Sequence, residues 1–306
     1  MDTIIFNALK YLFDSSLIGD AKDWMGIIMN GLSSVFQDQN VVTYFSIFSA
    51  AGASLMIIFF FIDIMDSASK DMVTFERLVL SFVKLLLGFC IMFYLPELLQ
   101  GLFSFINFIY QDLSELAADK VDFGLTYFGQ KEFPESMEAL EELTGEKVTF
   151  IEDGSLKDIL LGNFGAFFTF ILLFLATFAS KFVVFMVTIT NAISMVTRAI
   201  FAPLAVAQCF EDGQKSNAIK YLKKFAADGI TFAIVVGMLY AASVLQGNIV
   251  SSVLASIGEA KEITVENAML ILGNMKVVAS IIVISVSVVG ATFKASSMAQ
   301  DIVGAH

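Results

Sequence analysis

The feature that most constrains this chain is a set of long apolar segments with almost no charge. Five regions stand out, at about 42–65, 78–99, 159–210, 225–246 and 268–290, and an extension of the second past Pro96 to Tyr110 is left open. A helix needs about 20 apolar residues to cross a bilayer, and each region exceeds this length. The sequence therefore predicts an all-α polytopic membrane protein with about five transmembrane helices.

The composition favours the same class. The chain has 306 residues, of which 57% are hydrophobic and only 16% are charged. Soluble proteins keep about 25% of their residues charged, so the solvent for much of this chain is lipid. The net charge of −12 argues against general affinity for nucleic acid through the surface as a whole.

The apolar regions divide the chain into seven parts. Residues 111–158 hold 13 acidic residues and 4 lysines, which predicts either a domain that docks a partner or a solvated acidic spacer. The predicted parts are an amphipathic N-terminal segment (1–41), two transmembrane helices (42–110), the acidic loop (111–158), a long central helix region (159–210), a basic loop (211–224), two further transmembrane helices (225–293) and a tail (294–306).

The N-terminal segment predicts amphipathic helices. Apolar residues recur at helical spacing over 4–13 and again over 24–36. These helices fit a membrane interface, with Trp24 as an anchor at the level of the lipid headgroups. Packing against the protein's own spans is an equal alternative.

Lysine and arginine in the short loops predict the orientation. Loop 66–77 carries Lys70 and Arg77, and loop 211–224 carries four lysines. Basic loops face the cytoplasm, which places the N-terminus and the acidic loop outside and the C-terminus inside. This requires an odd number of crossings within 159–210. We therefore expect one long helix there, or a span followed by a re-entrant or cytoplasm-facing piece that Pro203 bends, rather than two spans.

The residues that most enzymes need are missing. The only histidine is the terminal His306, and no glycine-rich phosphate loop ends in Lys-Ser or Lys-Thr. Neither Asp63 nor Asp228 has a partner acid at a helical spacing that would suit an intramembrane protease. The sequence predicts no catalytic residue, no metal site and no cofactor.

Two charges inside apolar regions are candidates for a functional role. Arg198 lies in the central region, where it either reaches the cytoplasmic headgroups or pairs with a carboxylate or helix-end carbonyls in a protein seam. Lys276 lies nine residues into the last region, so it faces protein or an aqueous lumen, or extends to the membrane surface.

The basic loop leads into an amphipathic helix. In "KSNAIKYLKKFAADG", the residues Ala218, Ile219, Leu222, Phe225 and Ala226 share one face. Lys220, Lys223 and Lys224 occupy the opposite arc, and Lys215 precedes them. These lysines fit contact with anionic lipid or with an acidic partner, or they act only as a cytoplasmic anchor.

Small residues recur on the first span. Ser46, Ala50 and Ser54 lie every fourth position, with Gly52 adjacent. Small residues allow helices to approach closely in lipid, so this stripe predicts a helix-packing face.

The segment "TRAIFAPLAVAQCFEDGQKSNAIKYLKKF" resembles the central segment of the TrbL family of type IV secretion and conjugation channel subunits. In that family an arginine in a long helix is followed by a proline, a short polar loop and a Tyr-Leu-Lys helix. The matching elements here are Arg198, Pro203, "EDGQKS" and "AIKYLKKF". One departure is "FAADGITF", where relatives often carry a Gln, and this leaves no expected role for a polar residue there.

The resemblance implies a structural role in transport. Several copies would form a ring in the bacterial cytoplasmic membrane and contribute to the path of a DNA or protein substrate. Its partners would be other secretion subunits, ATPases and membrane lipids. Arg198 and Pro203 would act as a polar anchor and a fixed bend. Two alternatives are a secondary transporter that uses Arg198 and Lys276 for a small anionic substrate, and a scaffold that conducts nothing.

Overall fold

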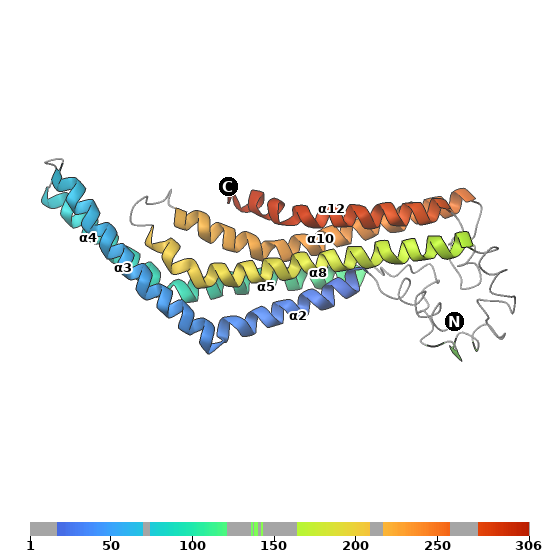
Figure 1. The fold of residues 1–306 in the computed structure, drawn as a ribbon, viewed down its shortest axis with the longest axis horizontal. Coiled ribbons are helices and arrows are strands. Elements are labelled where there is room, and N and C mark those ends of the chain that lie inside the picture. Colours follow the sequence, from blue (N-terminus) through green and yellow to red (C-terminus); the bar gives the residue numbers. More distant parts are fainter. Residues whose placement is uncertain are drawn as a thin grey trace. The chain divides into compact units, whose positions relative to one another are not determined.

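The computed structural model describes residues 17–69, 74–120, 136, 138, 139, 142, 164–208, 217–257 and 275–305. Over these residues the chain is helical and contains no strand, which confirms the all-α class. The helix predicted over 4–13 and most of the acidic loop lie outside the described residues. The seven helices of the described chain are α2 (Leu17–Gln37), α3 (Gln39–Ser69), α4 (Phe75–Phe93), α5 (Leu95–Lys120), α8 (Phe164–Ala207), α10 (Asn217–Ile257) and α12 (Met275–Val303) (Figure 1).

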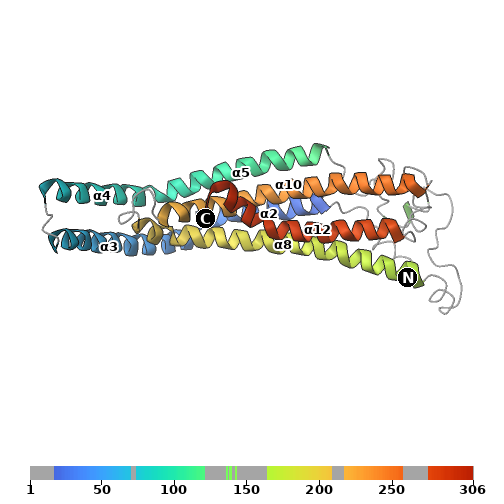
Figure 2. The ribbon, with the colours of Figure 1, turned by 90° about the horizontal axis from the view of Figure 1, so that it is seen from above.

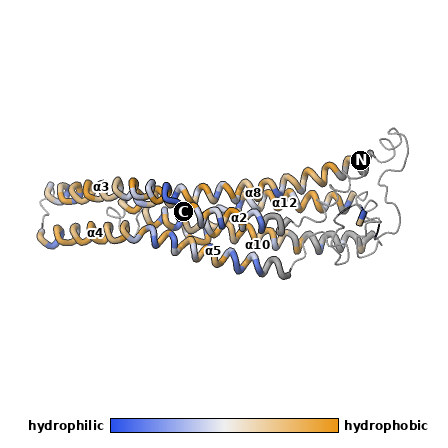
Figure 3. The backbone as a smooth tube through the Cα atoms, turned by 90° about the horizontal axis from the view of Figure 1, so that it is seen from below, coloured by the Kyte–Doolittle hydropathy of each residue, from blue (hydrophilic) through white to orange (hydrophobic). Residues whose placement is uncertain are grey.

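Four of these helices are long and apolar enough to cross a membrane. They contain the spans Gln39–Ser69, Ile171–Ala207, Ala218–Ala242 and Val278–Val303, and α4 with α5 up to Glu115 makes a fifth if the bent pair is one span. Hydrophobic residues predominate along α3 and α4 (Figure 3). Many of their large apolar side chains are exposed. An exposed apolar surface of this extent is stable in lipid and not in water. The protein is therefore a multi-pass membrane protein.

The boundaries of the first helices follow from local chemistry. The Asp38 carboxylate accepts from the backbone N–H of Asn40 at 2.8 Å, so it separates α2 from α3 as an N-cap. Thr74 caps α4 by accepting from the N–H of Arg77. α4 and α5 meet at Tyr94 with a bend of 52°. Pro96 lacks the N–H that would continue the helical hydrogen bonds, which explains the break.

The central apolar region forms one helix. α8 runs without interruption for 44 residues, with Pro203 inside its last turn and a half. It is roughly 66 Å long, twice the thickness of the hydrocarbon core of a bilayer. The structure thus has the single long helix and no re-entrant piece within residues 164–207.

The last helix extends past the predicted end of its span. The candidate span in α12 is Val278–Val303, and the helix continues to Val303 through residues predicted to form a tail, whereas residues 268–274 of the predicted region lie outside the described ones. Its buried positions repeat every three or four residues, which is the pattern of a coiled-coil seam: Val278, Ile281, Ser285, Val288, Thr292, Ala295 and Ala299. Helix α12 ends at Val303 and is followed by Gly304 with φ 64°, and the N–H of Ala305 donates to the carbonyl of Gln300 at 2.9 Å. This C-terminal cap is a Schellman motif.

The chain divides into two compact units. The first comprises residues 1–24, 113–186 and 235–293, and the second comprises residues 25–112, 187–234 and 294–306. In the first unit, the Ser180 hydroxyl on α8 donates to the carbonyl of Ser285 on α12 at 2.9 Å. In the second unit, α3 and α4 lie side by side as an antiparallel pair (Figures 1 and 2). The candidate sites below lie within the second unit.

Candidate functional site

A partly buried ion pair links the second half of α8 to the first half of α10. The Arg198 Nε lies 2.6 Å from Asp228 Oδ2, and the same oxygen accepts from the Ser194 hydroxyl at 2.7 Å. The Tyr221 hydroxyl donates to the carbonyl of Arg198 at 3.0 Å, and the Arg198 guanidinium lies 5.9 Å from the centre of the Tyr221 ring. We call Ser194, Arg198, Tyr221 and Asp228 the Arg198 cluster.

Helical register brings these four side chains together. Ser194 and Arg198 are four residues apart on α8, and Tyr221 and Asp228 are seven apart on α10, so each pair lies on one face of its helix. Arg198 is about two and a half turns from the end of α8, and Asp228 is a similar distance from the start of α10. The two charges therefore meet at matching depths in adjacent apolar helices.

The cluster is enclosed by apolar side chains. The Asp228 side chain is 4% exposed and that of Arg198 is 25% exposed. Phe225 and Phe232, one turn to either side of Asp228, are buried. Gly229 lets Ile106 of α5 pack against α10, because a Cβ at this position would lie 2.3 Å from the Ile106 Cδ1 atom. Water is thus largely kept away from the carboxylate.

The arrangement pairs two opposite charges in an apolar setting. A single charge at the centre of a membrane helix costs about 2.5–3.5 kcal/mol, and pairing removes most of that cost for both partners. The carboxylate has one cation and one hydroxyl on the same oxygen, and no histidine can act as a base because the only one is His306. Within the described residues, no group of three or more His, Cys, Asp or Glu side chains could hold a metal ion.

Pro203 marks a close crossing of two backbones. It is buried on α8, and a Cβ added to Gly52 of α3 would lie only 2.7 Å from the Pro203 carbonyl oxygen. The rings of Phe48 and Phe201 pack beside this crossing with centroids 4.5 Å apart. Pro203 and Gly52 therefore hold α8 against α3.

The stripe of small residues on α3 does not form the packing face within the described chain. Ser46, Ala50 and Ser54 are exposed, whereas Gly52 and Met56 are buried. The hydroxyls of Ser46 and Ser54 donate to carbonyls of their own helix. The predicted stripe is thus the wrong face for packing inside the chain, because α8 and α4 approach α3 from the side of Gly52.

The lysines lie on the predicted side of their helix. Ala218 and Phe225 are fully buried, Lys220 and Lys223 are exposed, and Lys224 is partly buried; Lys215 lies outside the described residues. Lys223 donates to the carbonyl of Gly304 at 3.3 Å. One of the three described lysines therefore holds the C-terminal end of α12 instead of facing only lipid or a partner.

Trp24 and Lys276 are both exposed in the described chain. Met25, Met29 and Leu32 of α2 are buried, so this helix packs on the protein itself, which was the alternative to an interfacial helix. Trp24 is half-exposed, and its ring meets the Phe185 ring edge-on with the two ring centroids 4.6 Å apart. Lys276 is exposed on α12, next to Met275, the first residue of that helix in the described chain.

Asp228 is the important residue that the sequence interpretation missed. It is the only acidic residue in the apolar region 225–246, as Arg198 is the only charge between 182 and 210. Two opposite charges in neighbouring spans are the usual signature of an intramembrane pair. The partner of Asp228 is thus a cation on the preceding helix and not a second acid on its own helix.

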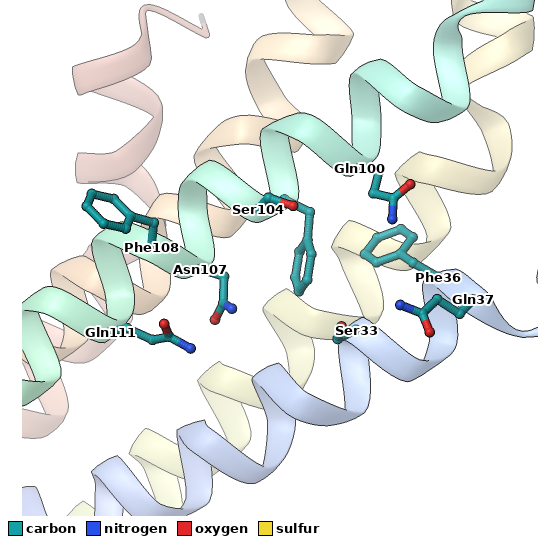
Figure 4. Close-up of a pocket in the computed structure, with 9 residues that line it drawn as sticks. Ser33, Phe36, Gln37, Gln100, Ser104, Asn107, Phe108 and Gln111 are labelled. Carbon is teal, nitrogen blue, oxygen red and sulfur yellow. The ribbon is translucent and has the colours of Figure 1, made fainter.

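A second polar feature is a groove between α2 and α5. Its volume is about 240 Å³, and it is open at the surface of the second unit. Carboxamide and hydroxyl side chains from both helices point into it, with aromatic rings between them (Figure 4). The groove is lined by Ser33, Phe36, Gln37, Gln100, Phe103, Ser104, Asn107, Phe108 and Gln111.

Comparisons with known proteins identify no relative of this chain. The chain matches no protein-family model, no curated protein and no solved structure.

Proposed function

We propose that this chain is an integral membrane subunit of a type IV secretion or conjugation machine. Several copies would assemble in the bacterial cytoplasmic membrane around the path of a DNA or protein substrate. The proposal begins from the resemblance of residues 197–225 to the TrbL family and is supported by the multi-pass arrangement of long apolar helices.

One observation carries the proposal beyond the resemblance. Arg198 and Tyr221 belong to the two ends of the resembling segment, and they meet through the Tyr221 hydroxyl and the Arg198 carbonyl at 3.0 Å. Pro203, between them, lies at the crossing with Gly52. The residues that carry the resemblance thus occupy connected, packed positions, as expected for a structural anchor in a shared machine.

The same geometry disfavours a transporter for small anions. The Arg198 guanidinium is engaged by the buried Asp228 carboxylate, so an anionic substrate would have to displace it. Arg198 is therefore better suited to fixing two helices than to binding a substrate.

Deletion of the gene should abolish transfer of substrate by a host that carries the complete machine, and the wild-type gene should restore it. The Arg198→Ala variant should fail to restore transfer while remaining in the membrane at normal abundance, because the buried Asp228 loses its counter-ion. Lys294→Ala is the matched control, since it removes an exposed positive charge from α12. Normal transfer by the deletion strain would reject the secretion role, and normal transfer by Arg198→Ala would reject the role of the anchor.

A further inference from the structure

The groove between α2 and α5 combines many neutral polar groups with aromatic rings. Gln37 on α2 and Gln100, Asn107 and Gln111 on α5 supply four carboxamides, and none of the nine lining residues carries a charge. The polar residues on α5 recur every three or four positions, so they form one continuous stripe that faces α2 (Figure 4).

This polar stripe lies on a membrane-type helix. Residues 100–111 belong to the bent candidate span that ends at Glu115, and the neighbouring Phe105 and Phe108 are 58% and 60% exposed. Carboxamides at an apolar surface are costly unless they are hydrogen-bonded. Within the described residues, the side-chain amides of Gln37, Gln100 and Asn107 have no hydrogen-bond partner.

We propose that this groove binds an uncharged, hydroxyl-rich glycosyl group, supplied by the headgroup of a neutral glycolipid or by a free saccharide. A carboxamide both donates and accepts hydrogen bonds, and so does each sugar hydroxyl. The rings of Phe36 and Phe103, whose centroids lie 5.2 Å apart, provide an apolar wall for the carbon face of the sugar.

The lack of charge selects against the common phospholipids. A phosphate group is normally held by Arg, Lys or a helix N-terminus, and the lining contains no Arg or Lys. The exposed Phe108 at the side of the groove gives a lipid chain a contact that a free saccharide lacks. The groove is therefore distinct in chemistry from the lysine face of α10.

Native mass spectrometry of the detergent-purified full chain tests this site. Monoglucosyldiacylglycerol should remain bound to the wild type in preference to phosphatidylglycerol. The double variant Gln100→Leu/Asn107→Leu should weaken glycolipid binding by about tenfold or more, since two neutral hydrogen bonds are lost. Gln208→Leu is the control, because Gln208 is an exposed amide outside the groove.

Competition with methyl glucoside identifies the source of the glycosyl group. If methyl glucoside displaces the glycolipid as effectively as the glycolipid itself does, the site is assigned to a free saccharide. If methyl glucoside displaces it only weakly, the site is assigned to the glycolipid. Both results support the proposal. If the double variant is not folded by circular dichroism, Gln100→Leu alone replaces it, since Gln100 is exposed. Equal retention of the two lipids by the wild type, or unchanged glycolipid binding in the variant, would overturn the proposal.

Discussion

At the scale of single residues, the stability of the second unit depends on whether Arg198 and Asp228 are both present. Breaking a buried ion pair by removing one partner is far more costly than replacing both, because the remaining charge stays buried without compensation. Asp228 is the more enclosed partner, since its side chain is 4% exposed against 25% for Arg198. Loss of the arginine is therefore the more damaging of the two changes.

A double-mutant cycle checks this dependence. Arg198→Met should lower the free energy of unfolding by roughly 3 kcal/mol, the lower end of the range for buried pairs, because Arg198 keeps some exposure. Adding Asp228→Asn should recover much of that loss. The measurement is unfolding of the purified protein in mixed micelles by increasing SDS, followed by circular dichroism.

Asp63→Asn supplies the matched control for this cycle. Asp63 is a partly buried acid on α3 that accepts a hydrogen bond from Ser81 of α4 and has no contact with Arg198. Effects of Arg198→Met and Asp63→Asn should add within about 0.5 kcal/mol, as independent sites do. Additive effects of Arg198→Met and Asp228→Asn would mean that the ion pair contributes nothing.

The residue scale is also where sequence reasoning reached its limit. The place of Arg198 in a helix and the exposed side of the lysine helix followed from apolar runs and 3.6-residue periodicity. The identity of the residue that pairs with Arg198 could not be predicted from these patterns, because pairing across 30 residues depends on which faces of α8 and α10 meet. The groove was missed for the same reason, since its amides are spread over two helices that are distant in the sequence.

At the scale of helices, the presence of the long apolar helices was more predictable than their packing faces. The apolar runs predicted the presence of α3, α8 and α10, since apolar length sets a span in lipid, although α10 extends over Asn217–Ile257, well beyond the predicted 225–246. Inside the chain, α3 packs through Gly52 and Met56 and not through the predicted stripe of Ser46, Ala50 and Ser54. The deciding position is Gly52, where the backbone of α8 comes within contact distance.

Substitution of Gly52 tests this packing face. Gly52→Ala should destabilise the protein although Ala is the better helix former, because its Cβ would lie 2.7 Å from the Pro203 carbonyl oxygen. Gly101→Ala should instead stabilise α5 by about 0.5–1 kcal/mol, since nothing lies within 4 Å of a Cβ at that position. Both variants are compared by SDS unfolding. A stabilising Gly52→Ala would show that α3 and α8 do not cross there.

At the scale of the whole molecule, the orientation of the second half depends on the bent pair of α4 and α5. If the pair crosses the membrane, the chain has five spans, and if it turns back, the chain has four. In the first arrangement the basic residues at the start of α10 and those between α3 and α4 lie on the same side. In the second arrangement they lie on opposite sides. The prediction from the basic loops requires five crossings.

Single cysteines at three exposed positions distinguish the two arrangements. Ser69→Cys, Glu138→Cys and Lys220→Cys would be introduced singly into a Cys90→Ser/Cys209→Ser background, because Cys90 is an exposed thiol. An impermeant maleimide added to intact cells should label position 138 only, and positions 69 and 220 only after permeabilisation. Labelling of 220 in intact cells with protection of 69 and 138 would mean four spans. The acidic loop would then face the cytoplasm, where it could not dock partners outside the cell, and the proposed arrangement of the secretion subunit would fail.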